Sequence, residues 1–275
     1  MRLTPPSATA WRWGGQKPTF AEHALVASNS PLASAAGAEI LKAGGNAVDA
    51  AVAVGFAMAV TYPEAGNIGG GGYMVIRLAD GRTDAIDYRE MAPAAAFAEM
   101  YIDSAGKLTN AGIVGRAASG VPGAVAGLTA AHAKYGSMPL DKVMAPAIRL
   151  AAEGFVVDSA LAASWVGKDT LIKLFAGADL LFPGGKPLPR GSRLVQPDLA
   201  ETLRAVAREG AAGFYRGRVA EKIAAEMTRG CPTGVTGRAR ASHACGFITT
   251  QDLANYQPAW RAPLRTTYRG YTLIT

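Results

Sequence analysis

Arg89 is the residue whose type and position best suit the binding of a substrate. It follows the β-prone run Ala85–Tyr88 and precedes Glu90–Pro93, so we expect it at the end of a strand, where a side chain can reach into a cleft beside a sheet. A guanidinium binds a carboxylate through two parallel hydrogen bonds, and Arg89 is therefore a candidate for carboxylate capture. The alternative is a structural ion pair with Asp87 or Glu90, which the local residues alone favour.

Two glycine-rich segments invite comparison with phosphate-binding loops, and both differ from them. Gly69–Gly72 lacks the G-x-G-x-x-G spacing and leads from a helical pattern into a strand pattern, whereas a phosphate loop leads into the N-terminus of a helix. Gly184–Lys186 is followed by Pro187, where the Walker sequence needs Ser or Thr. We interpret the first segment as a tight helix-to-strand crossing, with the wall of a site as the alternative, and the second as a turn.

The sequence offers no recognisable catalytic nucleophile and no complete set of metal ligands. No serine lies in a G-x-S-x-G frame, and His23, His132 and His243 are far apart without a partnering motif. Cys231 and Cys245 flank His243, but a structural zinc site uses four ligands, usually in short paired spacings. We therefore expect no catalytic residue, metal or cofactor here, and a surface loop at the cysteines.

Two consecutive helices are predicted near the N-terminal end. Pro31 begins an alanine-rich helical stretch that ends at Gly44–Gly45. Asn46 can cap the next helix, with Asp49 in its first turn, where the helix dipole favours a carboxylate. The residues Ala50–Val60 are almost entirely apolar, which indicates a helix buried on all sides.

Strands are predicted at both ends of the chain. Ala24–Ser28 is typical of a short strand, and Tyr73–Leu78 with Thr83–Tyr88 predicts a β-hairpin around a turn at Asp80–Gly81. Leu264–Thr275 alternates as a single strand would, and the sequence ends within it.

The middle of the chain is predicted to be mainly helical and to cover the sheet. Thr249 fits a further helix start, with Asp252 three positions later, and Tyr256–Trp260 is expected to be an extended connector. The helical patterns of the middle span Pro122–Lys134, Pro139–Glu153, Asp158–Phe175, Pro197–Glu209 and Ala211–Thr228.

Composition and charge exclude several classes of protein. The 275 residues are 49% hydrophobic and 18% charged, enough for one sizeable core. The net charge of +7 comes from dispersed basic residues, so we expect no nucleic-acid partner. Met1–Lys17 lacks the run of about 7–15 apolar residues of a secretory signal, and Ala50–Val60 is shorter than the ~20 residues that span a bilayer. We expect no membrane segment and a cytoplasmic rather than a periplasmic location.

Ten separated segments resemble one family, the γ-glutamyltransferases, and follow one another in the family's order. No single segment is specific, but the ordered set is. The segments are Val26–Ser28, Pro31–Ser34, Gly37–Ala51, Gly66–Tyr73, Asp87–Pro93, Gly120–Gly127, Lys134–Gly136, Ala145–Ala151, Phe214–Gly217 and Tyr268–Tyr271.

This resemblance implies an α+β fold, the αββα sandwich of N-terminal-nucleophile hydrolases, with this chain as an incomplete large-subunit portion. It implies a γ-glutamyl donor such as glutathione and an acceptor that is water, an amino acid or a peptide. The nucleophile implied is the N-terminal threonine of a small subunit, whose free α-amine acts as the adjacent base. Arg89 matches the family arginine that binds the donor α-carboxylate, which reverses the preference for a structural pair.

The sequence also departs from the family pattern. Thr249–Thr250 and Thr266–Thr267 do not precede a histidine, so neither provides the nucleophile. Residues 1–23 are expected to be a lead-in and residues 24–275 a large-subunit portion truncated at its C-terminus, with an atypical loop at residues 230–245. We expect this chain alone to be inactive and poorly soluble. The alternatives are another N-terminal-nucleophile acylase, of the cephalosporin acylase or poly-γ-glutamate-cleaving type, or a noncatalytic remnant.

Overall fold

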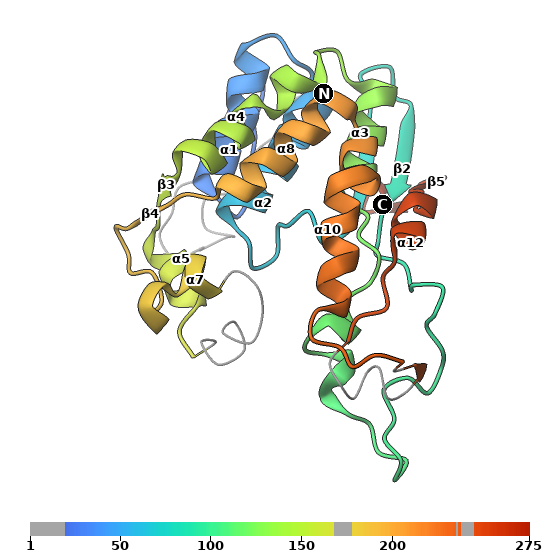
Figure 1. The fold of residues 1–275 in the computed structure, drawn as a ribbon. Coiled ribbons are helices and arrows are strands. Elements are labelled where there is room, and N and C mark those ends of the chain that lie inside the picture. Colours follow the sequence, from blue (N-terminus) through green and yellow to red (C-terminus); the bar gives the residue numbers. More distant parts are fainter. Residues whose placement is uncertain (1–19, 168–177, 235, 238–244) are drawn as a thin grey trace.

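The computed structural model describes residues 20–167, 178–234, 236–237 and 245–275 and combines helices and strands in an α+β arrangement, as expected (Figure 1). Within these residues no helix is both long and apolar enough to cross a bilayer. The helices are α1 (Pro31–Lys42), α2 (Ala47–Thr61), α3 (Ala124–Tyr135), α4 (Leu140–Glu153), α5 (Ser159–Ser164), α7 (Ala178–Leu181), α8 (Pro197–Glu209), α9 (Ala212–Tyr215), α10 (Gly217–Thr228) and α12 (Thr250–Asn255). The strands are β1 (Tyr73–Arg77), β2 (Thr83–Asp87), β3 (Phe155–Val156), β4 (Arg193–Leu194), β5 (Ala259–Arg261), β6 (Arg265–Tyr268) and β7 (Tyr271–Ile274).

The core is built around α2, whose apolar sequence lets nearly every face be buried. Val52, Phe56 and Val60 have no exposed surface. Helix α2 contacts α1, α3 and α4, and α4 contacts α8, so that α1, α2, α4 and α8 lie together on one side of the molecule (Figure 1). Helices α1 and α2 approach closely at Gly37, where any side chain would clash with Val54.

The start of α2 is fixed by a capping box, of which the sequence predicts the Asn46 cap. The side-chain oxygen of Asn46 accepts from the N–H groups of Val48 (2.8 Å) and Asp49 (3.0 Å), and Asp49 Oδ2 accepts from the N–H of Asn46 (2.9 Å). The fully buried Asp49 also accepts from the hydroxyl of Ser137 (2.6 Å), which follows α3. Burial raises the pKa of Asp49, but the hydrogen bonds from Ser137 and Asn46 outweigh it and hold the pKa below its ordinary value.

The three-stranded sheet has the order β1-β2-β5 and is antiparallel throughout. The predicted hairpin is confirmed, with Tyr73 opposite Asp87 and the turn at Gly81, where φ is +88°. Strand β5 continues the expected connector and pairs Trp260 with Ile86. The ammonium of Lys134 in α3 lies 3.9 Å from the ring centroid of Trp260, and this cation–π contact links the sheet to that helix.

The strand predicted at Ala24–Ser28 is absent. The segment has no assigned secondary structure, Leu25 is 59% exposed, and no other described strand runs beside it to satisfy its backbone. β-prone residues form a strand only where a partner strand is present. The helix predicted over Asp158–Phe175 begins as α5, and residues 168–177 lie outside the described part.

The helix predicted over Ala211–Thr228 is two helices, α9 and α10. Arg216 between them is extended, with φ −135° and ψ 163°, and Gly217 has φ +59°. These backbone angles interrupt the helical hydrogen-bond ladder, and the local helical pattern did not reveal the break.

The segment Leu264–Thr275 is a hairpin rather than one strand. Arg269 and Gly270 both have positive φ, 49° and 81°, and form a two-residue turn between β6 and β7. Positive φ at both central residues is what a tight hairpin needs. The alternation of the sequence correctly predicted strands but missed the reversal, because Arg is uncommon at such a position.

Candidate functional site

Arg89 lies where β2 ends, as the sequence predicts, and its peptide groups are held on both sides. Its N–H donates to Asp87 Oδ1 (3.1 Å), and its carbonyl accepts from the hydroxyl of Tyr256 (2.8 Å). Tyr256 follows α12, so the second bond joins residues 167 positions apart. The backbone at the candidate site is therefore positioned by two separate elements of the fold.

The guanidinium of Arg89 is more weakly restrained than its backbone. The side chain is 57% exposed, and Nε lies 3.3 Å from Glu90 Oε2. That oxygen is buried and accepts no hydrogen bond within the described part of the chain. The contact with Arg89 is therefore an ion pair without a hydrogen bond. Asp87 is instead occupied by Arg261, whose Nη2 lies 2.8 Å from Oδ2. Of the two structural partners that the sequence suggested, the structure pairs the Arg89 side chain with Glu90.

The carboxylate of Asp87 is ionised and committed to its two donors. The backbone hydrogen bond from Arg89 and the side-chain hydrogen bond from Arg261 hold its pKa below the ordinary value. A carboxylate with these partners orients the end of β2 and does not compete for the Arg89 guanidinium.

Tyr256, which donates a hydrogen bond to the Arg89 carbonyl, stacks against Tyr215. The rings of Tyr256 and Tyr215 are nearly parallel, 8° apart, with centroids separated by 5.6 Å. The hydroxyl of Tyr215 donates to the carbonyl of Pro122 (2.7 Å), just before α3. Burial raises the pKa of Tyr256 to about 12 and raises that of Tyr215 as well, so both hydroxyls stay protonated and can donate at neutral pH.

The glycine run Gly69–Gly72 is the tight crossing that the sequence indicated. A side chain on Gly71 would clash with the carbonyl oxygen of Tyr88 and with the backbone of Arg89. Because the run leads into β1, its backbone N–H groups are not arranged around a helix N-terminus, and the phosphate-loop interpretation stays excluded. Because the run has no side chains, its backbone can pack directly against the backbone of Tyr88 and Arg89.

Thr249, Thr266–Thr267 and His132 have structural roles. Thr249 caps α12, with its hydroxyl 2.6 Å from Asp252 Oδ2, and Thr266–Thr267 lie within β6. A ring nitrogen of His132 lies 2.8 Å from the carbonyl oxygen of Met138. The arrangement around Arg89 can bind and orient a carboxylate; a nucleophile is not among these residues.

The two cysteines form a disulfide, which the sequence interpretation missed. Cys231 and Cys245 are bonded with their Cα atoms 5.8 Å apart, and Cys245 is fully buried. The available signal was the even number of cysteines at the two ends of one unusual segment. His243 lies outside the described residues, and within those residues no group of three or more potential metal ligands is found.

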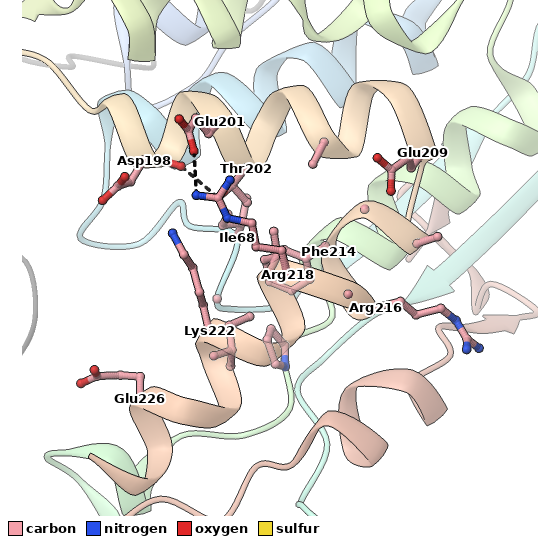
Figure 2. Close-up of a pocket in the computed structure, with 18 of the residues that line it drawn as sticks. Ile68, Asp198, Glu201, Thr202, Glu209, Phe214, Arg216, Arg218, Lys222 and Glu226 are labelled. Atoms are coloured by element: carbon pink, nitrogen blue, oxygen red, sulfur yellow. Dashed lines mark hydrogen bonds and ion pairs between the residues drawn. The ribbon is translucent and has the colours of Figure 1, made fainter. Parts of the chain in front are cut away.

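A separate cavity of about 910 Å³ lies between α8 and α10 (Figure 2). Its lining includes Ile68 and Gly69 from the glycine crossing but not Arg89. The partly exposed Ile68 and Ile223 contribute apolar surface, and charged side chains of both helices surround the opening. No local pattern in the sequence indicates this cavity, because α8 and α10 are brought together by tertiary folding.

Comparison with known proteins places residues 33–275 in the family model described as gamma-glutamyltranspeptidase. The chain is 45% identical over 261 residues to the glutathione hydrolase proenzyme of Escherichia coli (strain K12), covering 94% of this chain and 43% of the relative. It is 43% identical over 267 residues to the acylase ACY 1 proenzyme of Pseudomonas sp. (strain SE83), covering 94% of this chain and 45% of that relative. The chain thus spans less than half the length of these curated relatives.

A solved structure supports the same grouping. The fold matches the crystal structure of Helicobacter pylori gamma-glutamyltranspeptidase with a TM-score of 0.86 and 40% identity, covering 94% of this chain and 71% of that one.

Proposed function

Because this chain belongs to the γ-glutamyltranspeptidase family and has its N-terminal-nucleophile hydrolase fold, we propose that it is the large-subunit portion, residues 24–275, of a proenzyme that transfers or hydrolyses γ-glutamyl groups. The donor is glutathione or a related γ-glutamyl compound, and the acceptor is water, an amino acid or a peptide. The relatives named as glutathione hydrolase proenzymes support this substrate class.

The observation that carries the proposal is the contrast between the backbone and the side chain of Arg89. Asp87 and Tyr256 fix its peptide groups, while its guanidinium is 57% exposed and has one loosely placed partner. An arginine that served only as a structural pair would be expected to make direct hydrogen bonds to its acid. Arg89 is available to bind the α-carboxylate of a γ-glutamyl donor in a bidentate manner.

The chemistry requires a threonine from a small subunit, a part of the proenzyme outside these 275 residues. Its Oγ attacks the γ-glutamyl carbonyl carbon, its α-amine takes the hydroxyl proton, and that proton goes to the leaving amine as the amide bond breaks. Water or an amine then attacks the resulting ester and releases the threonine. Arg89 contributes orientation, since a donor held by its α-carboxylate presents its γ-carbonyl in a fixed place.

The test is substitution of Arg89 in the proenzyme with its small subunit. Loss of a charge-assisted pair removes about 1.5–3 kcal/mol, so Arg89→Ala should lower kcat/KM for a γ-glutamyl anilide by roughly 10- to 100-fold, and Arg89→Lys by less. Self-cleavage, followed on a gel, should be unchanged. Arg82→Ala is the matched control, because Arg82 is also exposed and pairs with Asp80 in the hairpin turn. Normal donor kinetics in fully cleaved Arg89→Ala enzyme would overturn the assignment.

The chain without a small subunit should be inactive. Purified residues 1–275 should show no turnover of the γ-glutamyl anilide above a heat-denatured sample. Turnover at the rate of an intact relative would contradict this expectation and would place a nucleophile within this chain.

An acylase is the second candidate, because the identity to the acylase ACY 1 proenzyme, 43%, is almost that to the glutathione hydrolase. The two functions differ in their dependence on Arg89. An acyl donor without an α-carboxylate should be cleaved equally by the parent enzyme and by Arg89→Ala, whereas a γ-glutamyl donor should not. A complete proenzyme that cleaves neither donor would favour a noncatalytic remnant.

A further inference from the structure

The cavity between α8 and α10 has the size and lining of a small-molecule site, and it is separate from Arg89. Its volume of about 910 Å³ falls within the range of ligand pockets. Helix α9 joins the two walls, and the apolar base of the cavity includes the partly exposed Ile68 and Ile223. Phe214 of α9 and Ile248 also line the cavity and are buried in the core, so they hold this base in place.

Three of the four acidic side chains that line the cavity form ion pairs. Glu201 lies 3.4 Å from Arg218 across the two helices, as Figure 2 shows. Glu226 lies 2.7 Å from Arg116, and Glu209 lies beside Arg208. The remaining acid, Asp198, is in the first turn of α8, where the helix dipole favours a negative charge.

Positive charge is left over at the same opening. Lys222 and Arg204 line the cavity, and neither has an ion-pair partner within the described ranges. In Figure 2 the side chain of Lys222 extends from α10 along the groove toward the N-terminal end of α8. An apolar base below an uncompensated ammonium matches a molecule with an apolar body and an anionic head group.

We propose that the groove between α8 and α10 binds a small amphipathic organic anion, with Lys222 contacting the anionic group and the partly exposed Ile68 and Ile223 contacting the apolar body. The proposal does not depend on γ-glutamyl chemistry, because Arg89 takes no part in the lining.

The experiment uses the proenzyme with its small subunit, because the chain alone is expected to aggregate, and two fluorescent probes of similar size. 8-Anilinonaphthalene-1-sulfonate carries one negative charge, and Nile red is neutral. The anionic probe should bind saturably, and Lys222→Glu should weaken its affinity by about 10- to 100-fold, since a charge-assisted contact is replaced by repulsion. The affinity for Nile red should change little.

Lys142→Glu is the matched control, because Lys142 is exposed on α4, away from the cavity, and the net charge changes equally. It should leave both affinities unchanged. If Lys222→Glu does not unfold cooperatively, Lys222→Met tests the same point, with loss of the preference for the anionic probe. Equal anion affinity in the parent chain and either Lys222 variant would overturn the proposal, as would an equal loss in Lys142→Glu.

Discussion

Two regions of the molecule differ in how completely their apolar side chains are buried. One is the helical region, made of α1, α2, α4 and α8, and the other is the strand region, made of β1, β2, β5, β6 and β7. In the helical region Phe56 and Val52 are fully buried. In the strand region Tyr73, Leu264 and Tyr268 are 67%, 73% and 60% exposed. The helices therefore contribute most of the buried apolar surface of this chain, whereas the strands present surface suited to contact with other segments. Arg89 lies in the strand region, at the end of β2.

The largest expected effect is at the buried cap of the helical region. Asp49→Ala removes the acceptor for Asn46 and Ser137 and should lower the free energy of unfolding by about 3 kcal/mol in urea titrations. Asp141→Ala is the control, because Asp141 is an exposed acid in the first turn of α4 and should cost about 0.5 kcal/mol. Equal losses in both variants would show that the buried cap contributes no more to stability than an exposed acid in a first helical turn.

The carboxylate of Asp49 should also make the free energy of unfolding depend on pH. Since the pKa of Asp49 is lowered by folding, its contribution is complete above the unfolded-state pKa of about 3.9 and is lost as the pH falls through the folded-state pKa. The deficit of Asp49→Asn relative to the parent chain should therefore be largest near neutral pH and shrink below about pH 4. Urea unfolding at a series of pH values measures it, and a deficit that grows on acidification would contradict the assignment.

A smaller effect is expected where α12 meets the strand region. Tyr256→Phe removes the hydrogen bond to the Arg89 carbonyl and should cost about 1 kcal/mol of stability. Tyr101→Phe is the matched control, because it removes a similar hydrogen bond, from the Tyr101 hydroxyl to the backbone carbonyl of Ala117 (2.9 Å). In the proenzyme with its small subunit, Tyr256→Phe alone should raise KM for the γ-glutamyl donor. The same KM in both variants would show that Tyr256 does not position Arg89.

The smallest change in stability is expected on the exposed strands. Leu264→Ser combined with Tyr268→Ser should alter the free energy of unfolding by less than about 0.5 kcal/mol, because neither side chain is buried. It should reduce the aggregation that we predict for the chain alone, measured by light scattering. A large fall in Tm would show that the strand region supports the core after all.

Most features encoded by neighbouring residues could be predicted from the sequence, apart from the turn at Arg269–Gly270, and features that join distant segments could not. The Asn46–Asp49 cap lies within four residues, and the place of Arg89 at a strand end follows from the β-prone run before it. The hydrogen bond from Tyr256 to Arg89 and the pairing of Arg261 with Asp87 depend on tertiary folding, which no local pattern specifies. The break at Arg216 was missed for a related reason, since Phe214 and Tyr215 before it are held by long-range packing.

The Cys231–Cys245 disulfide has a consequence for how this lineage can change. It holds the two ends of the segment together, with the Cα atoms of Cys231 and Cys245 5.8 Å apart. The entropy of closing a loop rises only slowly with its length, and α10 and α12 need not separate to accommodate more residues between the cysteines. We therefore expect residues inserted between Cys231 and Cys245, in evolution or by an engineer, to be tolerated without disturbing α10 or α12.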